Sequence, residues 1–215
     1  MNQLISWVEK RDFQTGEKYL LQELQKNPYD IELLFRLAMV RLQMPFADDD
    51  GAVGYLNKII ELEPYNFEAI IIKMYLQNFY CAMDEDFQKL VQHQWEKASA
   101  RAIVYYIVSW KYDYDKVDAG KEEAWLVKSI EEYPCFVYPF IKLAYIKEQK
   151  GMYKEAKRYY LNAINNIEKT EFLPEDSVSK EAFINEYITG TWNVNPQFIE
   201  RDLKLCEEKI KEIKL

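Results

Sequence analysis

The sequence predicts an all-α protein built from stacked antiparallel helix hairpins, and regularly spaced prolines are the main reason. Pro28, Pro64 and Pro134 each follow an amphipathic helical pattern that ends in a polar turn. The first two lie 36 residues apart and the last two lie 70 apart, which is two intervals of 35. The chain has only six glycines and is 49% hydrophobic, so disorder is not expected. A period in the mid-thirties that is carried by helices alone is typical of helical repeat arrays.

The most regular repeat covers residues 137–168. In both of its halves, apolar residues recur every three or four positions, as they do on one face of a helix. Gly151 stands between the halves, where a glycine commonly ends a helix. Ala144 and Ala156 are expected where the two helices approach closely, because a larger side chain there would cost about 1–3 kcal/mol. The apolar positions are Phe140, Leu143, Ala144, Tyr153, Ala156, Tyr160, Ala163 and Ile164.

In these residues the chain resembles the tetratricopeptide repeat (TPR) family, whose unit of about 34 residues has small and aromatic residues at fixed places. Lys147 departs from the pattern at the tyrosine place of the first helix, and Glu168 departs from it at the closing proline. The resemblance implies a right-handed superhelical stack, a TPR-like α-solenoid, of about five repeats over residues 1–168. Residues 169–215 are expected to add a C-terminal loop and capping helices to the same domain. The matching residues are Phe140, Leu143, Ala144, Tyr153, Ala156, Tyr160 and Ala163.

The earlier repeats follow the same pattern less regularly. Residues 2–10 and 13–28 are predicted to form the first hairpin. The second hairpin is predicted from residues 31–43 and from a helix that starts near Gly51 and is closed by Pro64. Its apolar face comprises Leu34, Leu37, Ala38, Ala52, Leu56 and Ile59.

Three aspartates precede Gly51 and are expected to cap that helix, because carboxylates accept hydrogen bonds from the free N–H groups at a helix N-terminus. A calcium loop is excluded here. Counting back from the glycine places Phe46 at the first position of the loop and Asn57 at the twelfth, and neither residue fits.

The middle of the chain is degenerate. Residues 67–79 are predicted to form a first helix, and residues 120–133 a second helix. Between them, residues 84–111 carry a continuous helical pattern in which no break is visible.

The C-terminal part is predicted to hold a short helix at residues 180–188, ended by Gly190, and a long helix that reaches about residue 213. Asn195 and Pro196 supply the cap and first position of the long helix. Its apolar positions alternate in steps of four and three, which is typical of a helix–helix seam. The favoured interpretation is a monomer in which this helix caps the last repeat, and the alternative is a homodimer through the seam. The seam residues are Ile199, Leu203, Cys206, Ile210 and Ile213.

Composition restricts the classes of partner. The net charge is −8, which argues against nucleic acid, because that affinity comes from lysine and arginine on phosphates. No apolar run is as long as a membrane span, and the N-terminus lacks a secretory signal pattern. Three widely spaced cysteines indicate reduced thiols, so a cytoplasmic protein is expected.

No motif predicts an enzyme or a cofactor. His93 is the only histidine, and no cysteine or histidine stands at a metal-ligand spacing from it. The 36 carboxylates include no pair that can be assigned as acid and base. We therefore expect a non-catalytic protein without a metal.

The resemblance implies that the first helices of successive repeats line an inner surface. Its inward positions are unusually apolar and aromatic, so they are expected either to anchor an amphipathic helix or extended peptide or to be covered by the C-terminal segment. They lack the lysines and asparagines with which some family members clamp an acidic chaperone tail. The candidate binding residues are Glu32, Phe35, Arg36, Met39, Ile71, Tyr75, Asn78, Ile103, Tyr106, Tyr138, Ile141, Lys142 and Tyr145.

The favoured function is a scaffold that binds a basic or amphipathic protein or peptide. Two alternatives stay open. The acidity and small size also suit an immunity or inhibitor protein that neutralises a basic toxin or enzyme. A peptide or small-molecule sensor is the third possibility.

Overall fold

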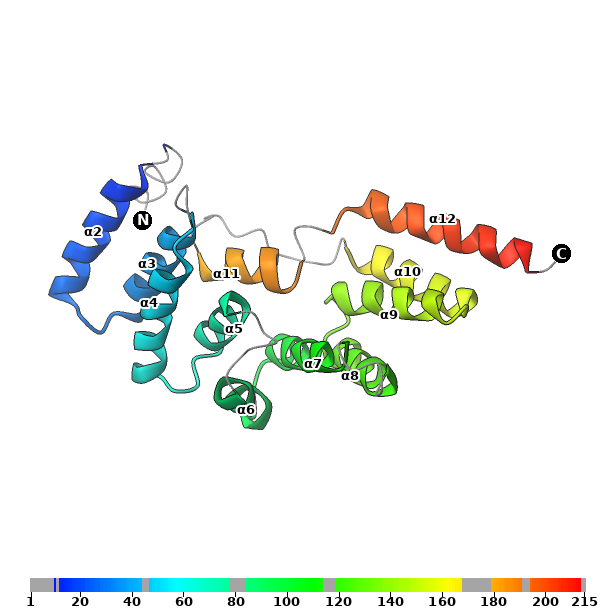
Figure 1. Cartoon of the computed structure of the whole chain (residues 1–215), viewed down its shortest axis with the longest axis horizontal. Helices are drawn as coiled ribbons and strands as arrows, with labels where there is room; N and C mark the ends of the chain where they lie inside the picture. Colours follow the sequence, from blue (N-terminus) through cyan, green and yellow to red (C-terminus); the bar gives the residue numbers. More distant parts are fainter. Residues whose placement is uncertain are drawn as a thin grey trace. The chain divides into compact units, whose positions relative to one another are not determined.

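The computed structural model describes residues 10, 12–43, 47–77, 84–113, 119–167, 179–190 and 194–213. Every element in these residues is a helix, as Figure 1 shows. The chain divides into two compact units. Unit 1 contains Met1–His93 and Leu173–Ile188, and unit 2 contains Gln94–Phe172 and Thr189–Leu215. This division does not follow the expected boundary at residue 168, and a single domain over the whole chain stays a prediction. The predicted opening helix at residues 2–9 lies outside the described residues.

Unit 1 is built from helices that contact one another in chain order. They are α2 (Phe13–Lys26), α3 (Ile31–Gln43), α4 (Asp49–Leu62), α5 (Phe67–Leu76) and α6 (Asp84–Gln92), followed late in the chain by α11 (Lys180–Phe183) and the π-helix η3 (Ile184–Ile188). All six apolar positions predicted for the second repeat are buried. The period of the sequence therefore placed this core correctly.

The aspartates before α4 cap that helix as expected. The Asp48 carboxylate accepts a hydrogen bond of 3.0 Å from the backbone N–H of Gly51. The same carboxylate pairs with Arg41 at 2.7 Å, and both contacts lower the Asp48 pKa. A side chain at Gly51 would collide with the Asp48 carboxylate, so this cap requires the glycine.

The continuous helix expected over residues 84–111 is wrong, because the structure interrupts it between α6 and α7 (Ala98–Asp113). The Arg101 guanidinium donates hydrogen bonds to the carbonyls of Trp95 and Glu96, at 2.7 and 2.5 Å. It also pairs with the Glu132 carboxylate. One side chain thus satisfies carbonyls that a continuous helix would have bonded internally. An apolar pattern does not register this replacement.

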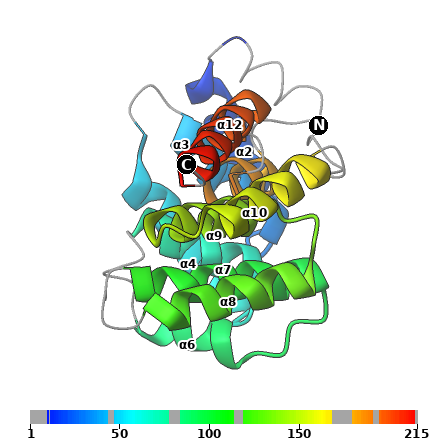
Figure 2. The ribbon, with the colours of Figure 1, turned by 90° about the vertical axis from the view of Figure 1, so that its right-hand side faces the viewer.

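Unit 2 comprises α7, α8 (Ala119–Glu132), α9 (Tyr138–Gln149), α10 (Tyr153–Ile167) and α12 (Pro196–Glu212). Figure 2 shows these helices following one another from α7 and α8 to α12, and each contacts the next. Gly151 separates α9 from α10 with a φ of +70°. Its N–H bonds to the Glu148 carbonyl, and that of Met152 bonds to the Lys147 carbonyl. The predicted glycine turn is therefore confirmed.

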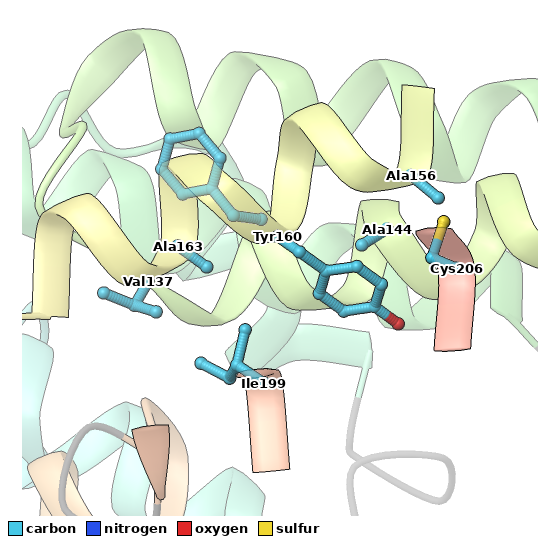
Figure 3. Packing of buried hydrophobic residues seen from close by; sticks show 8 residues of the cluster. Val137, Ala144, Ala156, Tyr160, Ala163, Ile199 and Cys206 are labelled. Atoms are coloured by element: carbon cyan, nitrogen blue, oxygen red, sulfur yellow. The ribbon is translucent and has the colours of Figure 1, made fainter. Parts of the chain in front are cut away.

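The last helix, α12, caps the hairpin of α9 and α10. Figure 3 shows Ile199 and Cys206 facing Val137, Ala144 and Tyr160. The side chains of Leu203 and Ile210 are partly buried against the same core, and only Ile213 of the seam is exposed. This packing confirms the capping helix and contradicts a homodimer through the first four seam residues, because their own chain covers them. The number of copies in solution stays a prediction.

The predicted end of the short C-terminal helix and the start of α12 are also confirmed. Gly190 has a φ of +63° just after η3. The Asn195 side chain accepts a hydrogen bond of 2.9 Å from the N–H of Gln197, and Pro196 is the first helical residue. Among the helices described, none has the length and apolar character needed to cross a membrane.

Candidate interaction surfaces

In unit 1 the C-terminal segment lies against the first helices of the hairpins. Helix α11 contacts α3, and η3 contacts α5. Four residues of the segment, Ala182, Phe183, Ile184 and Ile188, are buried. Helix α5 is apolar around its circumference, so it requires cover on two sides. The protein's own chain supplies the second cover, as the self-filled alternative requires.

Three predicted binding residues of unit 1 are core residues. Phe35 is 1% exposed, and Met39 and Ile71 are equally buried. The Lys180 ammonium lies 4.5 Å from the centre of the Phe35 ring. These side chains cannot touch a ligand while α11 and η3 are in place, because the space beside α3 and α5 is already filled.

The other predicted residues of unit 1 lie nearer the surface. Arg36 is largely covered and forms an ion pair of 3.0 Å with the exposed Glu32, one turn away on α3. Tyr75 is 36% exposed at the end of α5. Asn78 lies outside the described residues.

Tyr75 belongs to a cluster of three aromatic rings, which we call the aromatic cluster of unit 1. Its ring centre is 5.6 Å from that of Phe183 and 6.0 Å from that of Tyr187, and the latter two are 4.7 Å apart. Burial raises the pKa of both tyrosines, and the Glu186 carboxylate raises both further. The sequence analysis missed Phe183 and Tyr187. Their spacing of four residues in the predicted short helix was the available signal.

In unit 2 the predicted residues divide in the same way. Tyr106 is buried, and its ring meets those of Trp110, Phe136 and Tyr138 edge to face, with centres 5.1 to 5.8 Å apart. Ile103 is partly buried beside the same core. Tyr106 therefore holds α7 to α9 and is not a surface contact.

The remaining predicted residues lie on α9. Ile141 is partly buried against the cluster that α12 covers. The Lys142 ammonium lies 3.6 Å from a carboxylate oxygen of Glu122. Tyr138 is 36% exposed and Tyr145 is 54% exposed. These two tyrosines are seven residues apart on one helix, so they lie on the same face two turns apart.

Beneath α12, the titratable groups are held in unreactive forms. The Tyr160 hydroxyl donates to the Glu148 carboxylate at 2.9 Å. Burial raises the pKa of Tyr160, and Glu148 raises it further. Burial also raises the pKa of the Cys206 thiol, which donates to the Tyr153 carbonyl at 2.9 Å. A protonated, covered thiol is a poor nucleophile.

The described residues contain no group of three or more His, Cys, Asp or Glu side chains that could hold a metal ion. His93 stacks on Tyr65 with ring centres 4.7 Å apart and planes 20° apart. Its ring thus packs against a neighbouring aromatic ring, as a structural residue does.

Comparison with known proteins identifies the fold. No family model matches the chain, and no curated protein matches it. Solved structures of MamA do. One has a TM-score of 0.54 and 21% identity, covering 76% of this chain and 94% of the other. The structure of MamA 41-end from Desulfovibrio magneticus RS-1 has a TM-score of 0.56 and 18% identity, covering 80% of this chain and 94% of the other. MamA is a TPR-like all-α solenoid, so the predicted fold class is confirmed.

Proposed function

We propose that this chain is a non-catalytic scaffold that binds a protein partner through aromatic side chains on its first helices. The exposure of Tyr145 carries the proposal. Its neighbours on α9, Leu143 and Ala144, are fully buried, whereas more than half of the Tyr145 side chain stays in solvent. Packing in unit 2 does not account for an aromatic residue at this position. Tyrosine is enriched where protein interfaces concentrate their binding energy.

The chemistry of the described residues supports binding over catalysis. The buried thiol and phenol are protonated and covered, and no metal-ligand cluster is present among the described residues. The TPR-like fold presents helix surfaces, and its stacking leaves such surfaces free for other molecules. A fold alone does not decide function, so the proposal depends on the exposed rings.

The test compares Tyr145→Ala with Leu161→Ala. Leu161 is a partly exposed residue of α10, a second helix, and its exposure is 40%. The tagged protein is purified from its native cell, its partner is identified by mass spectrometry, and the affinity of each variant for that partner is measured. We expect Tyr145→Ala to weaken binding by about 1–3 kcal/mol and Leu161→Ala to leave it unchanged. Equal affinities with unchanged melting curves would show that this face is not the interface.

A further inference from the structure

The aromatic cluster of unit 1 combines a buried base with two accessible rings. Phe183 is buried, whereas Tyr75 is 36% exposed and Tyr187 is 43% exposed. The three rings come from two segments far apart in the sequence, the end of α5 and the C-terminal segment. Single exposed aromatic residues are ordinary on a protein surface. Rings in mutual contact at the edge of a covered helix form a larger continuous patch.

The C-terminal segment is shaped to present one of these rings outward. The π-helix η3 has a wider turn than an α-helix, and such turns occur often at functional sites. Within it, Ile184 and Ile188 are buried while Tyr187 points into solvent. The buried isoleucines fix the segment against unit 1, so the position of the exposed ring does not depend on a partner.

The electrostatic surroundings of these rings are acidic. Among the described residues, the charged groups that act on Tyr75 are the carboxylates of Asp49 and Glu186, and Glu186 also acts on Tyr187. Asp49 is exposed at the first turn of α4. No lysine or arginine within the described part of the chain lies over either tyrosine ring. A partly exposed patch with two ring faces and two carboxylates is complementary to a cation.

Unit 1 already holds a cation on one aromatic ring. Lys180 of the same C-terminal segment places its ammonium 4.5 Å from the centre of the Phe35 ring. The next rings along that segment, Phe183 and Tyr187, lie beside carboxylates and lack such a cation in the described residues. A guanidinium suits this arrangement better than an ammonium, because it is planar, stacks on rings and donates to a carboxylate at the same time.

We infer that Tyr75, Tyr187, Glu186 and Asp49 form a docking surface for an arginine-bearing basic segment of the partner protein. The guanidinium stacks on the exposed tyrosines and donates hydrogen bonds to the carboxylates. The net charge of −8 draws such a segment toward the chain. This inference rests on the proposed function for the statement that the ligand is a protein, and it adds the chemical class of the ligand and a second binding surface.

The experiment uses the full chain and a synthetic peptide of repeated Gly-Ser-Arg units, with a matched peptide in which citrulline replaces arginine. Binding is followed by the NMR shifts of the tyrosine ring signals. We expect saturable shifts of Tyr75 and Tyr187 with the arginine peptide, and about two- to fivefold weaker binding after Tyr187→Ser or Glu186→Gln. The controls are Tyr29→Ser and Glu61→Gln, which change an exposed tyrosine and an exposed glutamate of unit 1 elsewhere.

Each outcome decides the inference. Weakening by the patch variants alone supports it, provided that backbone amide spectra show unit 1 folded. Equal weakening by Tyr29→Ser and Glu61→Gln would mean that net charge alone attracts the peptide, and equal binding of the citrulline peptide would mean that charge is irrelevant. Either result overturns the docking surface. If the native partner is captured equally by wild type and the Glu186→Gln variant, the patch is wrong but the scaffold stands. If wild type captures no partner, the proposed function fails instead.

Discussion

Replacing Phe35 by alanine separates a core residue from a binding residue. Its inward position on a first helix predicted a ligand contact, but the structure buries the ring against α11 with Lys180 over its face. Only 1% of the residue is exposed, so truncation removes most of its buried apolar surface and leaves a cavity. Substitutions of this kind cost about 3–5 kcal/mol. A side chain that served only to touch a ligand would cost less than about 0.5 kcal/mol.

The measurement must report on unit 1 alone, because two compact units can unfold in separate steps. Hydrogen exchange of the α3 and α4 amides in increasing urea gives the free energy of unfolding of that unit. Tyr29→Ala is the matched control, since Tyr29 is 78% exposed in the loop before α3. We expect a large loss for Phe35→Ala and almost none for Tyr29→Ala. A Phe35→Ala variant as stable as wild type would show that the C-terminal segment does not cover α3.

Two further predictions concern individual contacts. Gly190→Ala should destabilise unit 2 by about 2–4 kcal/mol, because its φ is positive and a Cβ would meet the Tyr138 ring, whereas Gly151→Ala, with a positive φ in open space, should cost about 1–2 kcal/mol in thermal unfolding. A smaller loss for Gly190→Ala than for Gly151→Ala would refute the contact. Asp86→Ala should cost about 3–5 kcal/mol in urea unfolding, because it leaves the covered Lys73 ammonium, now 2.8 Å from the carboxylate, without that partner. Adding Lys73→Met should recover most of the loss, and a double variant as unstable as Asp86→Ala would contradict this account.

The local architecture was predictable because helix hairpins are encoded by neighbours in the sequence. Spacings of three and four residues identified the buried face of the second repeat, and Gly151 marked the turn between α9 and α10. The caps at Asp48 and Asn195 depend on residues within three positions of the helix start. Each of these features can be read within a short window. The break between α6 and α7 could not, because it depends on Arg101 reaching back to carbonyls five and six residues earlier.

The binding residues were harder to predict than the helices. The sequence shows that Phe35 and Ile71 are apolar and placed on inward positions, but the same apolar residue fits a groove and a core equally well. What decides is whether another segment covers it, and here the cover comes from residues 180–188, more than a hundred positions later. The apolar character of α5 on all sides indicated that some cover was needed. It did not indicate whether the protein or a partner supplies it.

The two C-terminal helices solve the same physical problem in different ways. A stack of hairpins leaves apolar surface open at its end and along its first helices. In unit 2, α12 covers the end of the stack, and its seam residues are consumed in doing so. In unit 1, α11 and η3 cover the first helices with buried apolar residues. If cover were the only requirement, an apolar or small residue would serve in place of the exposed Tyr187. A half-exposed ring beside the Glu186 carboxylate adds little burial, so its value to the protein must lie in what it presents to solvent, and that surface suits a cation.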